Sequence, residues 1–350
     1  MAKRKKATLS DIAATTGVAP MTVSRVVNGT GYVSEETREK VMTAVREMSY
    51  RPNGLARNLK RQRTDTVGLV LGDISNPYST ELANAVRKVL SARGYNLFIC
   101  ISEHSAKEDI TAFESLVDHN VDGIIVATRS NAEGDEHLRE IVEGDMPVIV
   151  VGRDFHHDMV DSVSADNLTG GFEATRHLID LGHRRIGFIG ATLNNKGSLK
   201  RLQGYLNALE AHGIEIDERL ITGRREAVSD VPGYSTERMG YEGMKRLLSL
   251  PNPPTAVFAR NDFTAVGAMT AIKEAALSIP KDVAIVGFDD IPLAVHTVPP
   301  LTTVRQPMRL QGQLAAELLV NRIADKEQRT RTERILNCEL IIRESTVSPN

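Results

Sequence analysis

From Thr66 onward, apolar runs typical of strands alternate with amphipathic runs typical of helices. This alternation limits the possible folds more than any other feature, because repeated strand–helix units build parallel sheets that helices cover on both faces. The sequence therefore predicts an α/β core. The predicted strands are residues 67–71, 97–101, 123–127, 147–151, 185–189, 255–259 and 283–288, and the predicted helices are about 79–93, 106–119, 135–143, 168–181, 198–212, 235–250, 262–276 and 308–323.

Two segments of the core would let the chain cross between two such lobes, residues 162–166 and a strand near 301–304. A length of 350 residues fits two or three domains at roughly 100–200 residues each. We therefore expect two parallel-sheet lobes. The expected core is residues 65–350, with one lobe from about 65–163 and 305–330 and a second from about 164–291 and 331–345.

The segment before this core differs from it in charge. The first 64 residues carry 13 lysines and arginines against five acidic residues, a net charge of +8, whereas the remainder carries 30 against 40, a net charge of −10. A small basic domain on a larger acidic body indicates a polyanionic partner. We favour nucleic acid over a solubilising tail, because the segment has the apolar content of a folded domain.

The basic segment predicts three short helices. Thr8 is placed to cap the first helix, and Gly17 to form a tight turn before Pro20 begins the second. Ser34 is placed to cap the third. Two short helices joined by a glycine turn, on a basic three-helix domain, predict an all-α helix-turn-helix head at residues 1–52.

The sequence carries no signal typical of a membrane or secreted protein. No run of about 18 apolar residues exists, so no membrane span is expected. Polar residues interrupt positions 7–14, where a secretory signal needs an apolar stretch. Cys100 and Cys338 lie in apolar strand-like runs, which favours buried, reduced thiols. We therefore expect a cytoplasmic protein.

Motifs of common enzymes are also absent from the sequence. It contains no phosphate-binding loop, dinucleotide-binding glycine motif, serine-hydrolase elbow or zinc-protease motif. The cluster of His156, His157 and Asp158 favours a polar loop over a metal site, because adjacent side chains diverge. We expect neither catalysis, nor a metal, nor a cofactor.

Specific residues of the head resemble the LacI/GalR family of bacterial repressors. The resemblance rests on Thr-Leu-Ser-Asp-Ile-Ala at 8–13, Gly-Val at 17–18, Thr-Val-Ser-Arg-Val-Val-Asn-Gly at 22–29 and Arg-Pro-Asn at 51–53. It continues through the core, which resembles periplasmic sugar-binding proteins. It implies a helix-turn-helix head, a hinge helix and a two-lobed, periplasmic-binding-protein-like core that binds an effector.

In this family the first residues of the second helix enter the major groove of DNA. The resemblance gives that place to Pro20 and Met21, which lack strong hydrogen-bond donors and are expected to contact thymine methyl groups. It places Arg25 on a guanine, because a guanidinium reads O6 and N7 together, with a phosphate contact as the alternative. Positions that bind phosphates in the family correspond to Thr22, Ser24 and Asn28.

Residues 53–64 resemble the family's hinge helix, which folds on DNA and enters the minor groove. Leu59 matches a leucine that wedges into a central base step, at an unstacking cost of about a few kcal/mol. Asn53 and Ala56 are also expected to contact DNA as part of this hinge helix. An ordinary linker helix is the alternative, but the segment is too basic and too poor in apolar residues to be stably helical alone.

Polar residues follow several predicted strands, at the ends where open α/β sheets bind ligands. By resemblance, Arg201 matches a ligand-gripping arginine, and Asn261 and Asp289 match residues that bond ligand hydroxyls or ring nitrogens. A carboxylate beside arginine donors suits vicinal hydroxyls. Further effector candidates are Tyr78, Ser79 and Arg153.

Alternatives remain open for several of these residues. Asn261 would also serve as a helix cap, and Tyr78 as part of a lobe core. Arg153 would also form an ion pair with Asp154, and Asp290 is expected to be structural by bonding loop amides.

A saccharide is the preferred effector. Sugar rings usually stack on aromatic side chains, for which the candidates are Tyr78, Phe155, Phe263 and Phe288. Family members that bind purines have two successive aromatic residues after the first strand, whereas Ser79 follows Tyr78 here. A purine or nucleoside is the alternative.

These features predict a ligand-responsive DNA-binding transcription regulator, a repressor of sugar-metabolism genes that acts on a pseudo-palindromic operator. The other classes considered are a sugar-binding protein, an enzyme and a constitutive architectural DNA binder. Eight residues follow the last predicted strand, about 335–342, too few for a tetramerising coiled coil. A homodimer is therefore expected, with its interface at about 79–93 and 264–276.

Overall fold

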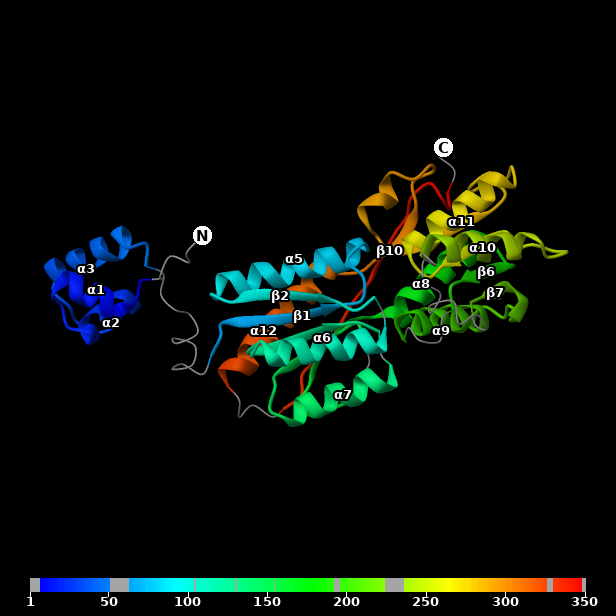
Figure 1. Cartoon of the computed structure of the whole chain (residues 1–350). Coiled ribbons are helices and arrows are strands. Elements are labelled where there is room, and N and C mark those ends of the chain that lie inside the picture. The colour runs from blue at the N-terminus through cyan, green and yellow to red at the C-terminus, as the bar shows by residue number, and fades with distance from the viewer. Residues whose placement is uncertain are drawn as a thin grey trace. The chain divides into compact units, whose positions relative to one another are not determined.

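The computed structural model divides the chain into two compact units, Met1–Thr64 and Asp65–Asn350, the first drawn in blue and the second in light blue to red (Figure 1). Within the described ranges, no helix has the length and apolar character that crossing a membrane requires. The structure describes residues 7–50, 63–103, 105–129, 131–153, 155–191, 196–223, 236–325 and 330–347.

The first unit contains three helices, α1 (Leu9–Thr16), α2 (Pro20–Asn28) and α3 (Glu35–Glu47). A capping box begins α1, in which Thr8 and Asp11 bond each other's backbone N–H. Ser34 caps α3, but Ala19 gives α2 no side-chain cap. One apolar cluster joins the three helices, so the predicted three-helix head is confirmed.

The first lobe of the second unit is one sheet with helices on both faces. Its strands are β1 (Thr66–Leu71), β2 (Asn96–Ile101), β3 (Gly123–Ala127), β4 (Val148–Val151), β5 (Asp161–Ala165) and β11 (Glu333–Leu336). Its helices are α5 (Pro77–Ala92), α6 (Ala106–Asp118), α7 (Ala132–Glu143) and α12 (Met308–Ala324).

The strands of this lobe are parallel, in the order β11-β5-β4-β3-β1-β2. Helices α5 and α12 pack on one face of the sheet, and α6 and α7 on the other (Figure 1). The inner strands β3 and β4 are almost entirely buried Val and Ile, as expected for strands covered on both faces.

The second lobe repeats this arrangement. Its strands are β6 (Ile186–Ile189), β7 (Ile221–Thr222), β8 (Ala256–Ala259), β9 (Ala284–Asp289), β10 (Thr302–Arg305) and β12 (Glu339–Ile341). Its helices are α8 (Asn167–Asp180), α9 (Lys196–Ala211), α10 (Thr236–Leu248) and α11 (Asp262–Glu274).

The sheet order of the second lobe is β12-β10-β9-β8-β6-β7, parallel except for the antiparallel pair β10–β12. Helices α8 and α9 pack on one face and α10 and α11 on the other. The predicted α/β class with two parallel-sheet lobes is therefore confirmed.

The chain crosses between the lobes after β5, after β10 and between β11 and β12. The first two crossings lie near the expected places, but residues 162–166 belong largely to β5, a strand of the first sheet. The predicted last strand, about 335–342, is two strands, because β11 pairs with β5 and β12 with β10. The sequence analysis expected residues 331–345 in the second lobe, whereas residues 333–336 form a strand of the first lobe.

The two cysteines also differ from the expectation of full burial. Cys100 on β2 and Cys338, between β11 and β12, are both half-buried and free. Burial raises the pKa of the Cys338 thiol to about 11.

Candidate functional site

The outward side of α2 carries the residues that the sequence assigned to the DNA major groove. Val23 and Val26 are buried in the core of the head, so the residues between and before them face outward. Met21 is 70% exposed, which is unusual for a large apolar side chain and leaves it available to a partner. The exposed or half-buried residues of this side are Pro20, Met21, Thr22, Ser24 and Arg25.

Two side chains near the end of α2 have defined surroundings. Asn28 Nδ2 donates to Ser24 O at 2.8 Å and lies 3.2 Å from Ser24 Oγ. The Arg25 stem lies beside Gly31, where an added Cβ would stand 3.5 Å from Arg25 Cδ. The expected hinge contacts Asn53, Ala56 and Leu59 lie outside the described residues.

A cleft in the second unit lies at the carboxyl ends of strands from both sheets, the place where open α/β sheets bind ligands. It is open to solvent and is lined mainly by polar residues. The structure brings all six predicted effector residues into its wall, namely Tyr78, Ser79, Arg153, Arg201, Asn261 and Asp289.

Arg201 on α9 is held by contacts with several strand ends. Its Nε donates to Asn167 Oδ1 at 2.7 Å, and its Nη1 donates to Arg260 O at 2.5 Å. Its Nη2 lies 3.6 Å from Asp289 Oδ1, and the guanidinium lies 3.7 Å from the centroid of the Phe288 ring. Burial lowers the pKa of Arg201, while Asp289 acts in the opposite direction.

Asp289 is the carboxylate beside this arginine. It ends β9 with φ of +114°, a backbone conformation that costs a residue other than glycine about 1–3 kcal/mol and that occurs often at functional sites. Its Oδ1 accepts a hydrogen bond from Gln306 Nε2 at 2.6 Å. Burial raises the pKa of Asp289, and Arg201 opposes this shift.

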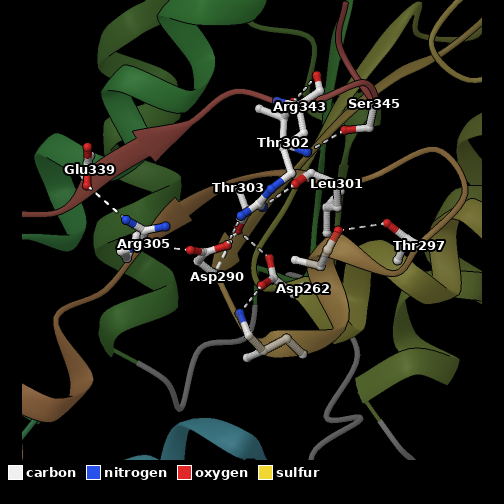
Figure 2. Close-up of polar contacts among 12 residues, drawn as sticks. Asp262, Asp290, Thr297, Leu301, Thr302, Thr303, Arg305, Glu339, Arg343 and Ser345 are labelled. Atoms are coloured by element: carbon white, nitrogen blue, oxygen red, sulfur yellow. Dashed lines mark hydrogen bonds and ion pairs between the residues drawn. The ribbon is translucent and has the colours of Figure 1, made fainter.

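The two other acidic residues near this strand end support the loop. Asp290 accepts hydrogen bonds from Arg305 Nε and Arg343 Nη2, each at 2.7 Å. Asp262 accepts one from the Thr303 hydroxyl and one from a backbone N–H of the loop after β9 (Figure 2). Asp290 is structural as expected, but its side chain bonds two arginines instead of loop amides.

Asn261 combines a structural contact with a place in the wall. Its Oδ1 caps α11 by accepting from Thr264 N at 3.0 Å and from Thr264 Oγ1 at 2.7 Å. The residue also lines the cleft. The cap and the ligand contact are therefore compatible, since the cap uses the amide oxygen and leaves the amide nitrogen to a ligand.

Tyr78 and Ser79 form the first-lobe wall at the start of α5. The Tyr78 hydroxyl donates to Gln311 Oε1 of α12 at 2.7 Å, and burial raises the pKa of Tyr78. Ser79 is 8% exposed. Asn76 caps this helix by accepting from the backbone N–H of Tyr78 at 3.0 Å, which fixes both residues at the strand end.

Arg153 follows β4 and is almost fully buried. Its Nη1 donates to Thr128 Oγ1 at 2.9 Å, and its Nη2 forms an ion pair with Asp135 of α7. Burial lowers the pKa of Arg153, while Asp135 and Asp109 oppose the shift. The ion-pair partner expected from the sequence, Asp154, lies outside the described residues. Among the described residues, Asp135 forms an ion pair with Arg153.

Two glycines make room for arginines of the second-lobe wall. At Gly171 of α8 an added Cβ would overlap the backbone carbonyl oxygen of Arg201. At Gly190, with φ of +103°, it would stand 2.6 Å from Arg260 Cδ. Both positions therefore require glycine for the arginines to lie where they do.

Several residues of the wall were not identified from the sequence. One of them is Arg129, which follows β3. Of the four aromatic candidates, Tyr78 alone lies in the described wall, because Phe155 and Phe288 are buried in the apolar clusters of the lobes. The further polar residues include Asn167 and Gln306.

Two family models match the chain. Residues 8–53 match the model described as bacterial regulatory proteins, lacI family. Residues 175–346 match a periplasmic binding protein-like domain. The matches cover the helical head and most of the second lobe with the crossing segments.

Similar proteins match the chain over nearly its whole length. The HTH-type transcriptional regulator DegA of Bacillus subtilis is 36% identical over 342 residues, covering 97% of this chain and 98% of that protein. The ribose operon repressor of Haemophilus influenzae is 37% identical, covering 98% and 99%. The HTH-type transcriptional repressor PurR of Mannheimia succiniciproducens is 33% identical, covering 97% and 98%.

Solved structures give the same result. A complex of the transcriptional regulator CelR with cellobiose is 34% identical with a TM-score of 0.72, covering 97% of this chain and 99% of that one. The lac repressor dimer bound to operator and the anti-inducer ONPF is 26% identical with a TM-score of 0.83, covering 98% and 100%.

Proposed function

The chain belongs to the LacI family of bacterial regulatory proteins, and from this premise we propose that it is a repressor of sugar-metabolism genes that a saccharide releases from its operator. Proteins of this family are DNA-binding transcriptional regulators and not enzymes. We also infer that the protein acts in the cytoplasm, where its DNA target lies.

The observation that carries the proposal is the meeting of Arg201, Asn261 and Asp289 in one cleft wall. The arginine supplies donors, the carboxylate accepts hydroxyl protons, and the amide nitrogen of Asn261 adds a donor beside them. Such a set suits the adjacent hydroxyls of a sugar ring. The wall of the first lobe adds Tyr78, Ser79 and Arg153 opposite.

A saccharide is favoured over a purine by the scarcity of aromatic surface. Tyr78 is the one aromatic side chain in the described part of the wall, and its hydroxyl is already bonded to Gln311. A sugar ring can stack one face on this single aromatic ring, whereas a flat purine offers two faces for aromatic stacking. Relatives named for ribose and a structure with cellobiose support the sugar, while the PurR relatives keep the purine as the second candidate.

A homodimer on a pseudo-palindromic operator is proposed as the active form. One head reads only a few base pairs, so two heads on a twofold axis are needed for a specific site. The lac repressor dimer on its operator supports this assembly. Each head would use Pro20, Met21, Thr22, Ser24, Arg25 and Asn28, with Asn53, Ala56 and Leu59 of the hinge segment in the minor groove.

Control of DNA binding would follow from the position of the cleft between two lobes. A ligand changes the equilibrium between two lobe arrangements only if it binds one of them more tightly. Since the proposed contacts come from both lobes, the saccharide would favour the closed arrangement, which binds the operator weakly.

A thermal-shift screen with the full-length protein tests the effector class. Mono- and oligosaccharides, purine bases and nucleosides are added separately, and a ligand at 100 times its dissociation constant should stabilise the protein by about 2.7 kcal/mol. Stabilisation by a sugar supports the proposal. Stabilisation by a purine or nucleoside alone would contradict it.

A further inference from the structure

The first-lobe side of the cleft holds a carboxylate that the proposed contacts do not use. Asp73 lies between β1 and α5, lines the cleft and is half-buried. Its Oδ1 accepts hydrogen bonds from the backbone N–H and from the hydroxyl of Ser75, each at 2.7 Å. These two bonds orient the carboxylate, while its Oδ2 has no partner among the described residues. One oriented carboxylate oxygen is therefore available to a ligand.

Asn76 supplies a hydrogen-bond donor three residues further along. Its Oδ1 caps α5 by accepting from the backbone N–H of Tyr78 at 3.0 Å. Because the cap uses the amide oxygen, both hydrogens of Nδ2 are left for a ligand, and no described residue accepts them. Asn76 also lines the cleft. The short segment between β1 and α5 therefore contributes one acceptor and one donor to the wall.

The second lobe contributes the same two chemical groups. Asp289 is its carboxylate, and Asn261, whose Oδ1 caps α11, is its amide. Each lobe thus combines a carboxylate with the amide of a helix-capping asparagine. On a sugar ring, one hydroxyl can donate to a carboxylate while its neighbour accepts from an amide N–H. Two such pairs on opposite lobes suit a ligand with hydroxyls along both of its edges.

The other first-lobe candidates do not replace Asp73 as an acceptor. The side chain of Arg153 is 2% exposed and donates to Thr128 and Asp135, and an arginine has no acceptor atom. The Tyr78 hydroxyl donates to Gln311 and is a neutral group, which accepts a weaker hydrogen bond than a carboxylate does. Asp73 is the one carboxylate that the first lobe contributes to the described wall.

A ligand that fills the cleft makes this acceptor decisive for binding. Water can bond to Asp73 Oδ2 while the cleft is open, but a bound ligand displaces that water. A carboxylate oxygen left without a hydrogen bond then costs more free energy than an unpaired neutral group does. A hydroxyl that donates to Oδ2 avoids this cost, so a site of this kind strongly rejects an analogue that lacks the hydroxyl.

We infer that Asp73 determines specificity in the first lobe, where its Oδ2 accepts a hydrogen bond from one hydroxyl of the saccharide and Asn76 Nδ2 donates to the neighbouring hydroxyl. This pair lies opposite the pair formed by Asp289 and Asn261. The inference rests on the proposed function and deepens it by adding a second hydroxyl subsite. The effector is then a saccharide that presents adjacent hydroxyls to both lobes.

Calorimetric titration of the full-length protein with neutral sugars tests this role. The titrants are D-ribose, D-glucose, D-galactose, cellobiose and maltose. Asp73→Asn keeps Oδ1 for Ser75 and replaces Oδ2 with an amide nitrogen, which cannot accept a hydrogen bond. We expect the sugar that binds the wild type most tightly to bind this variant about 10-fold or more weakly, because a hydrogen bond to a charged group contributes more than a neutral one.

Monodeoxy forms of that sugar distinguish a ligand contact from a structural effect. One of them lacks the hydroxyl that Asp73 binds, and it should bind the wild type about 10-fold or more weakly than the parent sugar does. The same form should bind Asp73→Asn nearly as tightly as the parent sugar, because the substitution has already removed the contact. A purely structural role of Asp73 would instead weaken every form by the same factor.

Asp118→Asn is the matched control, because Asp118 is exposed at the end of α6 and lies outside the cleft wall. It makes the same chemical change and should leave the affinity for the sugar as it is in the wild type. Thermal unfolding of both variants without sugar shows whether each one folds like the wild type, which separates lost binding from lost folding.

Two results would overturn the inference and leave the saccharide repressor intact. One is a sugar that binds Asp73→Asn as tightly as it binds the wild type. The other is an equal loss of affinity for each monodeoxy form in both proteins. A wild-type protein that binds none of the five sugars would overturn the inference and the proposed function together.

Discussion

The contacts of single residues in the cleft join strand ends that lie far apart in the sequence. Arg201 of α9 meets Asn167 after β5 and Asp289 at the end of β9. Each strand end contributes one or two polar side chains, and the sheet order brings them together. A single substitution in this set therefore changes several contacts, and its effect on ligand binding should exceed its effect on the rest of the fold.

In the head, Arg25 is the residue whose role is most open to a direct test. Replacing Arg25 with alanine should reduce discrimination at one base pair of each half-site by about 1–3 kcal/mol, because a bidentate contact to guanine is lost. Affinities for an operator selected from randomised DNA and for an unrelated duplex measure this effect. Arg46→Ala, a change of an exposed arginine on α3 with the same loss of charge, is the control. Equal weakening on both duplexes would identify Arg25 as a phosphate contact.

His177 predicts how stability depends on pH. It lies on α8, with Nε2 2.9 Å from Thr346 Oγ1, and burial lowers its pKa below 6.5. The unfolded chain then binds more protons than the folded one as the pH falls past 6.5, so stability should decrease on acidification from about pH 7 to 5. His183, whose pKa burial also lowers, contributes in the same direction.

Chemical denaturation at several pH values measures this dependence. His177→Gln should make the slope of stability against pH smaller in that range. An unchanged slope in the His177 variant would show that this histidine does not contribute to the pH dependence of stability.

Single strands and helices show what the sequence predicts and what it does not. Helix starts were predictable where a cap marks them, as at Thr8 and Ser34, and buried strands where β-branched residues run together. The two residues of β7 are too few to form a pattern. Strands β11 and β12 were predicted as one strand, because only two residues separate them and the change of pairing partner leaves no mark in the sequence.

The residues of the cleft were also predictable only in part from the sequence. The sequence predicted Arg201, Asn261 and Asp289 because they follow strands and match a family pattern. It did not reveal that Arg153 pairs with Asp135, since the partner comes from a helix placed by tertiary packing. It also missed Arg129, which follows β3 of the first lobe and lines the cleft.

The exposed edge strand β2 suggests a place for the proposed dimer contact. It lies at one end of the first sheet and exposes Phe98 and Ile99, at 44% and 43%. The expected segments at 79–93 and 264–276 overlap α5 and α11, which pack on α12 and α10 within the chain, and they stay a prediction. An edge strand with exposed apolar residues commonly pairs with another chain.

Phe98→Asp should therefore raise the dissociation constant of the dimer about 10-fold or more, as loss of a buried apolar contact does at interfaces. Sedimentation at micromolar concentration measures the effect. Ile335→Asp is the matched control, because Ile335 is 59% exposed on β11, at the opposite edge of the same sheet. Dissociation by Ile335→Asp and not by Phe98→Asp would move the interface to the other edge.

For the whole molecule, the division of charge separates the two tasks of the chain. The first 64 residues carry +8 and the remainder −10. The head is therefore attracted to the DNA backbone while the core is repelled by it, which confines DNA contact to the head.

Operator affinity should depend steeply on salt because the head binds phosphates through its basic residues. Neutralising six to ten phosphates would lower the affinity by about 10³–10⁵ between 50 and 200 mM salt. Fluorescence anisotropy with a labelled operator gives the slope. An affinity that stays constant over this range would contradict electrostatic binding by the head.

The central claim is that a saccharide in the cleft controls binding of the operator, and a linked titration tests it most directly. Operator affinity of the full-length protein is measured with and without the sugar that stabilises it, for the wild type and for Arg201→Ala. The account predicts that the sugar weakens operator binding by the wild type about 5- to 150-fold, while Arg201→Ala binds the operator but does not respond to the sugar. Unchanged operator affinity at saturating sugar, or a full response in Arg201→Ala, would contradict it.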